Sequence, residues 1–401
     1  MSPLRNPTAP ATGICPDPPR VNLPLVLLVQ VFNHTCFKGS KVLLTLFALH
    51  LGASPFVVGV LFAMYSVLPA FVSVFAGKLS DRVGYRWPML LGSSGMLAGM
   101  LLPFLAPGIP ALFFSATLIG GFYIFYTVAV QHLVGSLGSG ASRTRNYSWY
   151  ALCVGLTSLA GPVIVGFSIE GLGHARTYLL MAGLPVLPAL ILLARAPPPP
   201  RAAPATGSPG PRRIMDLIRL VPLRKALLTG GILETGSEIG NFLLPVYAES
   251  VGLSPSQIGL VVGALAAALM LVRALLPILV RFASEERVLG HSLLLAAAGC
   301  LSFPFVEGFV PLLIAAFVMG LGIGCGAPLS MVLVYNRTPD GRSGEAMGLR
   351  HTVNKATEGV VPIVFGSMST ALGMLPVFAA VALLLAFGGM QLTRERPEPG
   401  G

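Results

Sequence analysis

A polar stretch inside an apolar segment constrains this chain more than any other feature. The stretch QVFNHTCFKGSK occupies residues 30–41, within an apolar run from about residue 22 to 49. On a helix at 100° per residue, one face carries, within an arc of about 80°, Gln30, His34, Lys38 and Lys41. An ionisable side chain in a membrane-spanning helix costs several kcal/mol unless it is paired or hydrated. The stripe therefore predicts a functional site that faces water or other protein, not lipid.

The chain repeats itself about two hundred residues later. LGASPFVVG at 51–59 matches VGLSPSQIG at 251–259, and GPVIVGFSIEGLG at 161–173 matches VPIVFGSMSTALG at 361–373. Two distant matches at one offset indicate two related halves. In this register the basic stripe corresponds to a second stripe, within about 60° of arc, formed by Glu234, Glu238 and Asn241. We therefore expect a cationic helix face in one half and an acidic one in the other.

The composition indicates a polytopic helical membrane protein. Hydrophobic residues make up 54% of the 401 and charged residues only 10%, which excludes an ordinary soluble domain. Apolar stretches of the roughly 20 residues needed to cross a bilayer recur at 22–49, 55–76, 88–106, 109–133, 146–169, 175–194, 223–248, 256–281, 288–306, 309–334, 345–369 and 374–392. We read the first as a retained span because no small-residue cleavage site follows it. The expected fold is an all-α membrane protein with twelve transmembrane helices in two pseudo-symmetric six-helix bundles.

This pattern divides the chain into five parts. They are a disordered cytoplasmic tail (1–21), an N-terminal bundle (22–194), a cytoplasmic linker with a basic amphipathic helix (195–222), a C-terminal bundle (223–392) and a C-terminal tail (393–401). Of the 26 Lys and Arg residues, Arg176 alone falls in a predicted outer loop, so the positive-inside rule puts both termini in the cytoplasm. The same asymmetry accounts for the net charge of +11 without a nucleic-acid partner. We expect the bacterial inner membrane and a monomer.

The loop GKLSDRVGYR at 77–86 carries a recognisable pattern. Its glycine, acid, base, glycine and base are Gly77, Asp81, Arg82, Gly84 and Arg86. This spacing resembles the signature loop of the major facilitator superfamily. The resemblance implies two bundles with a substrate cavity between them near the midplane, and a cytoplasmic latch formed by these loop residues. The glycine-rich fifth span of export-type members is similar to a set here, Gly155, Gly161, Pro162 and Gly166.

In that fold the first and seventh spans face each other, so the two stripes are expected to meet. Glu234 or Glu238 could then exchange a proton with the cavity, and protonation would release Lys38 to contact substrate. The alternative is a fixed charge pair that holds the bundles in register. We interpret His34 as a hydrogen-bonding group and Glu358 as a further cavity candidate.

Two arginines are expected to have structural roles, and four polar or aromatic residues have two possible roles each. For Arg350 we favour pairing within its own helix, and Arg273 is expected to anchor one end of its bundle. Substrate contact and ordinary packing are equally good interpretations for the cavity-lining candidates Gln30, Tyr123, Tyr126 and Gln131.

Together these features predict a proton-coupled secondary transporter that exports a small organic or amphipathic compound by alternating access. Uptake of an organic anion by proton symport, with Lys38 and Lys41 as counter-charges, is the alternative, and a transport-like membrane sensor is another. The chain has no H-E-x-x-H, no G-x-S-x-G and no phosphate-binding loop, so we do not expect an enzyme. The five cysteines are scattered singly, so no metal or cofactor is predicted.

Overall fold

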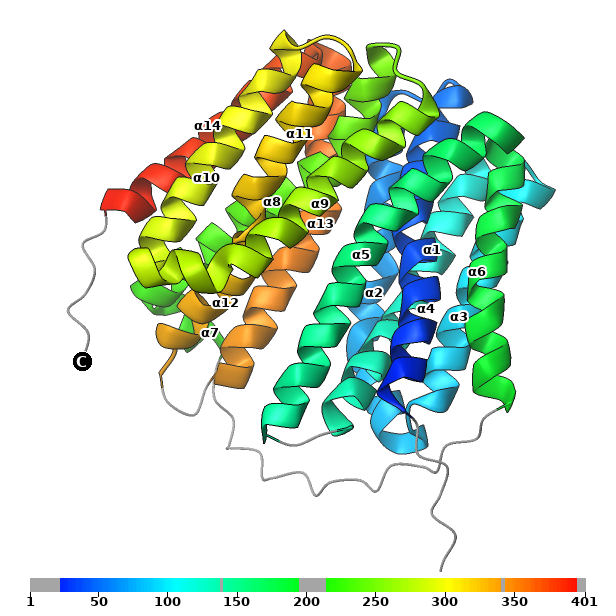
Figure 1. Ribbon diagram of the computed structural model, residues 1–401, viewed down its shortest axis with the longest axis horizontal. Coiled ribbons are helices and arrows are strands. Elements are labelled where there is room, and N and C mark those ends of the chain that lie inside the picture. The colour runs from blue at the N-terminus through cyan, green and yellow to red at the C-terminus, as the bar shows by residue number, and fades with distance from the viewer. Residues whose placement is uncertain (1–21, 138–139, 195–213, 340–342, 395–401) are drawn as a thin grey trace, which may run out of the picture.

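The computed structural model describes residues 22–137, 140–194, 214–339 and 343–394, and every element within them is helical (Figure 1). The N-terminal half contains α1 (Leu23–His50), α2 (Pro55–Val83), α3 (Arg86–Leu105), α4 (Ile109–Ser136), α5 (Gly140–Leu172) and α6 (His174–Ala194). The C-terminal half contains α7 (Ile214–Arg219), α8 (Val221–Ser250), α9 (Pro255–Phe282), α10 (Glu285–Ser302), a short 3₁₀ helix (Phe303–Phe305), α11 (Phe309–Gly324), α12 (Gly326–Asn336), α13 (Ser343–Leu372) and α14 (Met374–Arg394). The two halves stand side by side, which confirms the predicted all-helical, two-bundle architecture.

Eight helical segments are long and apolar enough to cross a membrane, by length and composition. The tenth predicted span is one of them, although it is built from α11 and α12 with a break at Cys325. The long helices outside these eight are α2, whose apolar part Pro55–Pro69 is shorter, and α1, α8 and α13, which carry the predicted intramembrane charges. The lower hydropathy of α1, α8 and α13 follows from their polar faces.

A proline explains the break between α11 and α12. Pro328 has no N–H to donate to the carbonyl of Gly324, four residues earlier. Arg273 of α9 donates its Nε–H to that freed carbonyl oxygen at 3.3 Å. The break therefore leaves a carbonyl inside the C-terminal half that a basic side chain satisfies.

The repeated L-G-x-S-P motif forms the same turn in both halves. Gly52 and Gly252 have positive φ angles of 79° and 81°, where glycine ends the preceding helix without a Cβ clash. Ser54 and Ser254 then cap the next helix, each accepting a hydrogen bond from a backbone N–H three residues later. The proline at the first helical position fits because its missing N–H needs no partner there.

The same repeat builds the contact between the halves. A methyl group added to Gly59 of α2 would lie 2.2 Å from the carbonyl oxygen of Pro362 on α13, and one added to Gly259 of α9 would lie 2.5 Å from that of Pro162 on α5. Two further contacts follow the same symmetry, Gly166 with Pro255 and Gly366 with Pro55. We call these four glycine–proline contacts the hairpin seal, because they lie toward the end where the α1–α2 and α8–α9 hairpins turn.

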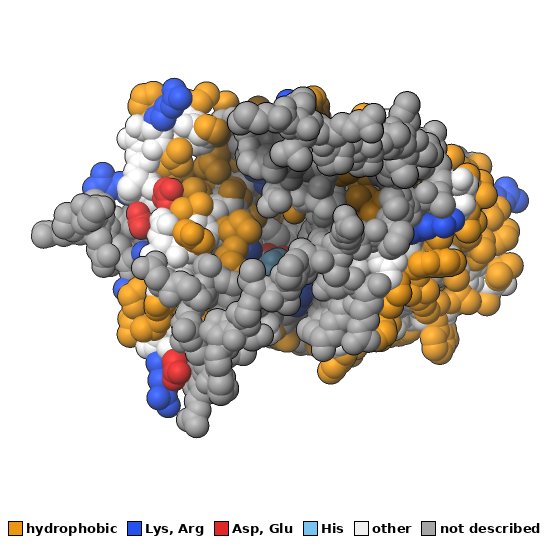
Figure 2. Space-filling model, turned by 90° about the horizontal axis from the view of Figure 1, so that it is seen from below, with side chains coloured by type: hydrophobic (Ala, Val, Ile, Leu, Met, Phe, Trp, Pro, Cys, Tyr) orange, Lys and Arg blue, Asp and Glu red, His pale blue; other side chains and the backbone are white. Residues whose placement is uncertain are grey.

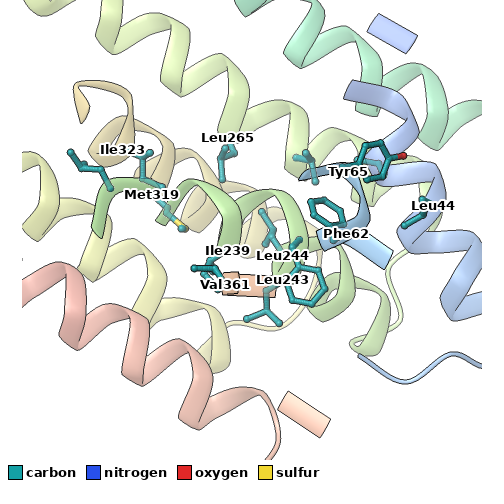
Figure 3. Packing of buried hydrophobic residues seen from close by; sticks show 14 of the residues in the cluster. Leu44, Phe62, Tyr65, Ile239, Leu243, Leu244, Leu265, Met319, Ile323 and Val361 are labelled. Atoms are coloured by element: carbon teal, nitrogen blue, oxygen red, sulfur yellow. The ribbon is translucent and has the colours of Figure 1, made fainter. Parts of the chain in front are cut away.

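Below the seal, the halves share an apolar layer. The rings of Phe62 on α2 and Phe242 on α8 are fully buried, with centroids 5.6 Å apart. Figure 3 shows this part of the core, with Phe62 and Tyr65 of α2 near Leu243 and Leu244 of α8. From the opposite end, the surface is hollowed between the halves, and charged side chains are visible inside the hollow (Figure 2). The shared site therefore lies between an apolar, sealed end and a recessed end.

Candidate functional site

A buried ion pair joins the two halves. The Lys41 Nζ of α1 lies 3.0 Å from the Glu358 Oε1 of α13, and the two side chains are only 6% and 11% exposed. Lys355, one turn before Glu358, contacts the second carboxylate oxygen. Removing one partner would leave a buried charge uncompensated, which makes this pair a strong constraint on how the halves meet.

Aromatic rings surround the Lys41 ammonium. Its Nζ lies 4.9 Å from the ring centroid of Phe62 and 5.7 Å from those of Phe37 and Tyr65. The Tyr65 hydroxyl donates a hydrogen bond of 3.0 Å to the Ser40 Oγ, which fixes the ring. Cation–π attraction of this kind is worth about 2 kcal/mol or more where the cation is desolvated. Lys41 is therefore held by Glu358 and the rings together.

Lys38, one turn earlier on α1, is in a different situation. It is half-buried, and among the described residues it makes no hydrogen bond and no ion pair. It is close enough to sense the charges of Glu234, Glu238 and Glu358 across the interface, and that of Lys41 on its own helix. The predicted cationic stripe thus contains one compensated and one uncompensated ammonium.

The acidic residues of α8 lie opposite this stripe without closing an ion pair among the described residues. Glu238 is buried at 4% exposure, and its Oε2 has no hydrogen-bond partner within the described part of the chain. It senses the charges of Lys38 and Lys41, as well as those of Glu358 and Lys355. Lys41 therefore pairs with Glu358 of α13 and not with a carboxylate of α8. Glu238 makes no ion pair with Lys41 among the described residues, but the two charges act on each other.

Two members of the predicted stripes turn away from this cluster. The His34 Nδ1 lies 2.6 Å from the Thr157 Oγ1 of α5, within the N-terminal half. Asn241 donates its Nδ2–H to the carbonyl oxygen of Ser237 on its own helix at 2.9 Å. Neither side chain meets the opposite half through a described hydrogen bond.

The aromatic candidates of α4 separate into two groups. Tyr123 stacks on Phe37 of α1 with centroids 3.8 Å apart and planes 10° from parallel, so it supports the residue next to Lys38. Tyr126 is fully buried, as is Gln30, and their side-chain polar atoms lack hydrogen-bond partners among the described residues. Gln131 is exposed. Phe37 is not among the predicted site residues, although its position four residues before Lys41 places it on the same face of the helix.

A second polar region lies inside the C-terminal half. It surrounds about 280 Å³ of space not filled by atoms, part of it open to solvent, and its lining includes Glu234, Ser237, Arg273, Ser330, Arg350 and Asn354. Arg350 donates to the Ser330 Oγ at 3.0 Å and to the Ala327 carbonyl oxygen at 3.2 Å. The expectation that Arg350 pairs within its own helix is therefore wrong, because α12 presents acceptors beside the helix break.

The structure describes only part of the predicted latch. Gly84 ends α2 with a φ of 78°, a conformation that favours glycine. Arg86 donates to the carbonyl oxygens of Leu192 and Leu193 at 2.8 and 2.9 Å, where a cation favours the C-terminal end of α6. The remaining latch positions, Gly77, Asp81 and Arg82, lie outside the residues whose side chains the structure describes.

The cluster suits ionic and proton chemistry. Its core is Lys38, Lys41, Glu238, Lys355 and Glu358, contributed by α1, α8 and α13 from the two halves. Among the described residues, no group of three or more His, Cys, Asp or Glu side chains is placed to hold a metal ion. The arrangement can bind a charged or polar solute and can change its net charge through a carboxylate.

Comparison with known proteins gives the same architecture. Solved structures similar to this chain include the nucleoside transporter NupG, at a TM-score of 0.79 with 16% identity over 93% of this chain and 100% of that one. The peptide transporter POT superimposes with a TM-score of 0.78 at 15% identity, over 96% of this chain and 95% of that one. At such identities the likeness shows the fold alone, here the twelve-helix fold of two bundles.

Sequence relatives are transport and resistance proteins. The chain is 19% identical to the quinolone resistance protein NorA of Staphylococcus aureus, over 82% of this chain and 84% of the relative. It is 29% identical over 165 residues to the human vesicular acetylcholine transporter, and 29% identical over 121 residues to the class B tetracycline resistance protein of Escherichia coli. The matched regions cover 40% and 30% of this chain, and span only 31% and 30% of those two relatives.

The family itself is shown by a match along nearly the whole chain. The model of the Major Facilitator Superfamily matches residues 26–281 and 226–401, which together include both halves and the cluster between them. The chain therefore belongs to the Major Facilitator Superfamily.

Proposed function

We propose that this chain is a proton-coupled secondary transporter that moves a small organic or amphipathic compound across the cytoplasmic membrane by alternating access. The observation that carries the proposal is Glu238, a buried carboxylate with an unpartnered oxygen, facing the cations of the other half. An ionisable residue at such a place has a functional role by default. A carboxylate with a purely structural role would instead form an ion pair, as Glu358 does with Lys41.

In the proposed cycle, Glu238 gains and loses a proton as the cluster opens to alternate sides. While ionised, it attracts Lys38 and holds the two halves together. In export by exchange, a proton on Glu238 and the compound occupy the site alternately; in the symport alternative, protonation releases Lys38 to contact the compound. Lys41 and Glu358 keep their ion pair when Glu238 is protonated and set how the halves meet. Glu234, half-buried one turn away, is the second candidate for the proton.

The proposed direction is export, with both termini in the cytoplasm of a bacterial cell. Support for export comes from the names of NorA and of the class B tetracycline resistance protein. Under this orientation the hairpin seal closes the outer side and the hollow of Figure 2 opens to the cytoplasm. Residues 77–86 then lie on the cytoplasmic side, where the proposed latch would act.

A second candidate function is uptake of an organic anion by proton symport. The observation that favours it is Lys38, a cation at the interface with no described ion pair. The charge of Lys41, by contrast, is already compensated, so it no longer supports this alternative.

The test is flux of a compound panel into inside-out vesicles with an imposed pH gradient. Export by proton exchange predicts uptake of at least one compound into vesicles that are acidic inside, and loss of that uptake when a protonophore collapses the gradient. Flux that ignores the gradient for every transported compound would overturn proton coupling. Vesicles from cells lacking the protein give the background.

A further inference from the structure

The charges of the cluster do not cancel. Lys41 and Lys355 both contact the single carboxylate of Glu358. Glu238 is the other carboxylate close to the lysines, and it senses all three of them. Counting Lys38, three ammonium groups therefore face two carboxylates. Glu234 senses Lys41 and Lys355 as well, and its charge acts on both Lys38 and Arg350. With Glu234 and Arg350 included, four cations face three carboxylates, so an excess of one positive charge remains.

The uncompensated charge is on Lys38. It is the lysine of this group with no hydrogen bond or ion pair among the described residues. An ammonium away from bulk water is costly unless an anion or water compensates it. A cationic ligand would add to the excess positive charge, whereas a ligand with one negative group would remove it.

The neighbours of Lys38 suit an apolar body. Phe37 is the adjacent residue, half-buried and stacked on Tyr123 at 3.8 Å. Its ring also lies 5.9 Å from that of Tyr65, edge to face. On the helix Phe37 points about 100° away from Lys38, so the apolar body of a ligand whose charged group meets Lys38 would extend round α1 to contact these rings.

We propose that the transported compound carries a single anionic group, a carboxylate or sulfonate, on an apolar or aromatic body, and that Lys38 is its counter-charge. This inference rests on the second candidate function, symport of an organic anion, and names the substrate class of the same site.

The site also determines how such an anion and a proton affect each other. Ionised Glu238 competes with the anion for Lys38, and protonation ends the competition. The other charged groups that Glu238 senses are Lys41 on α1, Lys355 and Glu358 on α13, and Glu234 on its own helix. Because linkage is reciprocal, a proton on Glu238 strengthens anion binding and the anion strengthens proton binding. Positive linkage of this kind makes anion and proton move together, as in the symport alternative.

The experiment compares three probes with one aromatic body: naphthoate, the neutral naphthamide and the cationic naphthylmethylamine. Their binding to the purified full-length protein is measured by calorimetry at pH 8 and pH 6. We expect naphthoate to bind more tightly than both matched probes. Lys38→Gln should weaken naphthoate binding about 10- to 100-fold, the range expected for a charge-assisted contact, and should leave naphthamide unchanged.

Two variants serve as controls. Lys38→Arg keeps the charge and should restore most of the affinity. Lys225→Gln removes an exposed lysine at the start of α8, outside the cluster, and should leave naphthoate binding unchanged. Glu238→Gln imitates the protonated carboxylate and should bind naphthoate more tightly at pH 8 than the unmodified protein does at the same pH. Thermal melting of each variant shows that it is folded.

Three results would overturn the inference: naphthoate that binds no better than naphthamide, naphthoate binding that survives Lys38→Gln, or Glu238→Gln that weakens binding. The vesicle flux test of the proposed function is separate. Tight, Lys38-dependent binding without gradient-driven flux would refute coupled transport and leave the substrate class standing. Gradient-driven flux of cations alone would refute the anionic substrate class and leave coupled transport standing.

Discussion

Adding one methyl group to the hairpin seal should open it. In Gly59→Ala the new Cβ would lie 2.2 Å from the Pro362 carbonyl oxygen, whereas ordinary contact begins at about 3.4 Å. The difference, 3.4 minus 2.2, requires α2 and α13 to separate by about 1.2 Å along that line. Overpacking of this size costs about 1–3 kcal/mol in the sealed state. The ratio of open to sealed molecules should therefore rise about 5- to 150-fold.

The assay is the distance between spin labels on the two halves at the sealed end. Leu51 follows α1 and Leu372 ends α13, and they are 36% and 63% exposed, so labels there do not disturb the core. Gly59→Ala should add a longer distance to the distribution. Gly259→Ala is its symmetry mate and should do the same independently.

Gly183→Ala on α6 is the matched control, because a Cβ there meets nothing within 4 Å. It should leave the distribution unchanged. If Gly59→Ala and Gly259→Ala both gave the distribution of Gly183→Ala, the seal would not be a steric contact that holds this end closed.

Three further changes test other parts of the molecule. Glu358→Gln leaves buried cations uncompensated and should cost about 3–5 kcal/mol of stability in detergent melts. The separate double variant Lys41→Glu with Glu358→Lys should be more stable than Glu358→Gln, and equal or lower stability would argue against a direct pair. Arg350→Ala should cost about 1.5–3 kcal/mol and Ser330→Ala less, because Arg350 also bonds a backbone carbonyl; equal losses would contradict this. Asp81→Asn should slow turnover more than it weakens binding, as rates and affinities measured together would show, and an unaltered rate would argue against a latch.

Much of the architecture was predictable because it follows from local chemistry. The repeat at one offset encodes a glycine that ends a helix, a serine that caps the next and a proline that starts it, and these requirements are the same in both halves. The repeated glycines then allow the close contacts of the seal. The polar stripe of α1 was predictable for a different reason, since charges in a membrane span need a buried partner.

The pairing inside the site was less predictable. Spacing along α1 places Lys41 on the correct face, but the choice between Glu238 and Glu358 depends on how α8 and α13 are rotated, which the sequence does not encode locally. The position of Arg350 depends on the helix break at Cys325. Pro328, four residues after Gly324, indicates this break in the sequence. His34 turns toward Thr157 of its own half, a partner 123 residues away.

Proton movement through Glu238 is the central claim, and it can be measured in proteoliposomes that contain a pH-sensitive dye. Adding a compound identified by the vesicle panel should change the internal pH when the unmodified protein is present. Glu238→Gln should exchange labelled for unlabelled compound across the membrane and produce no pH change. A full, substrate-dependent pH change with Glu238→Gln, at equal insertion, would contradict the account.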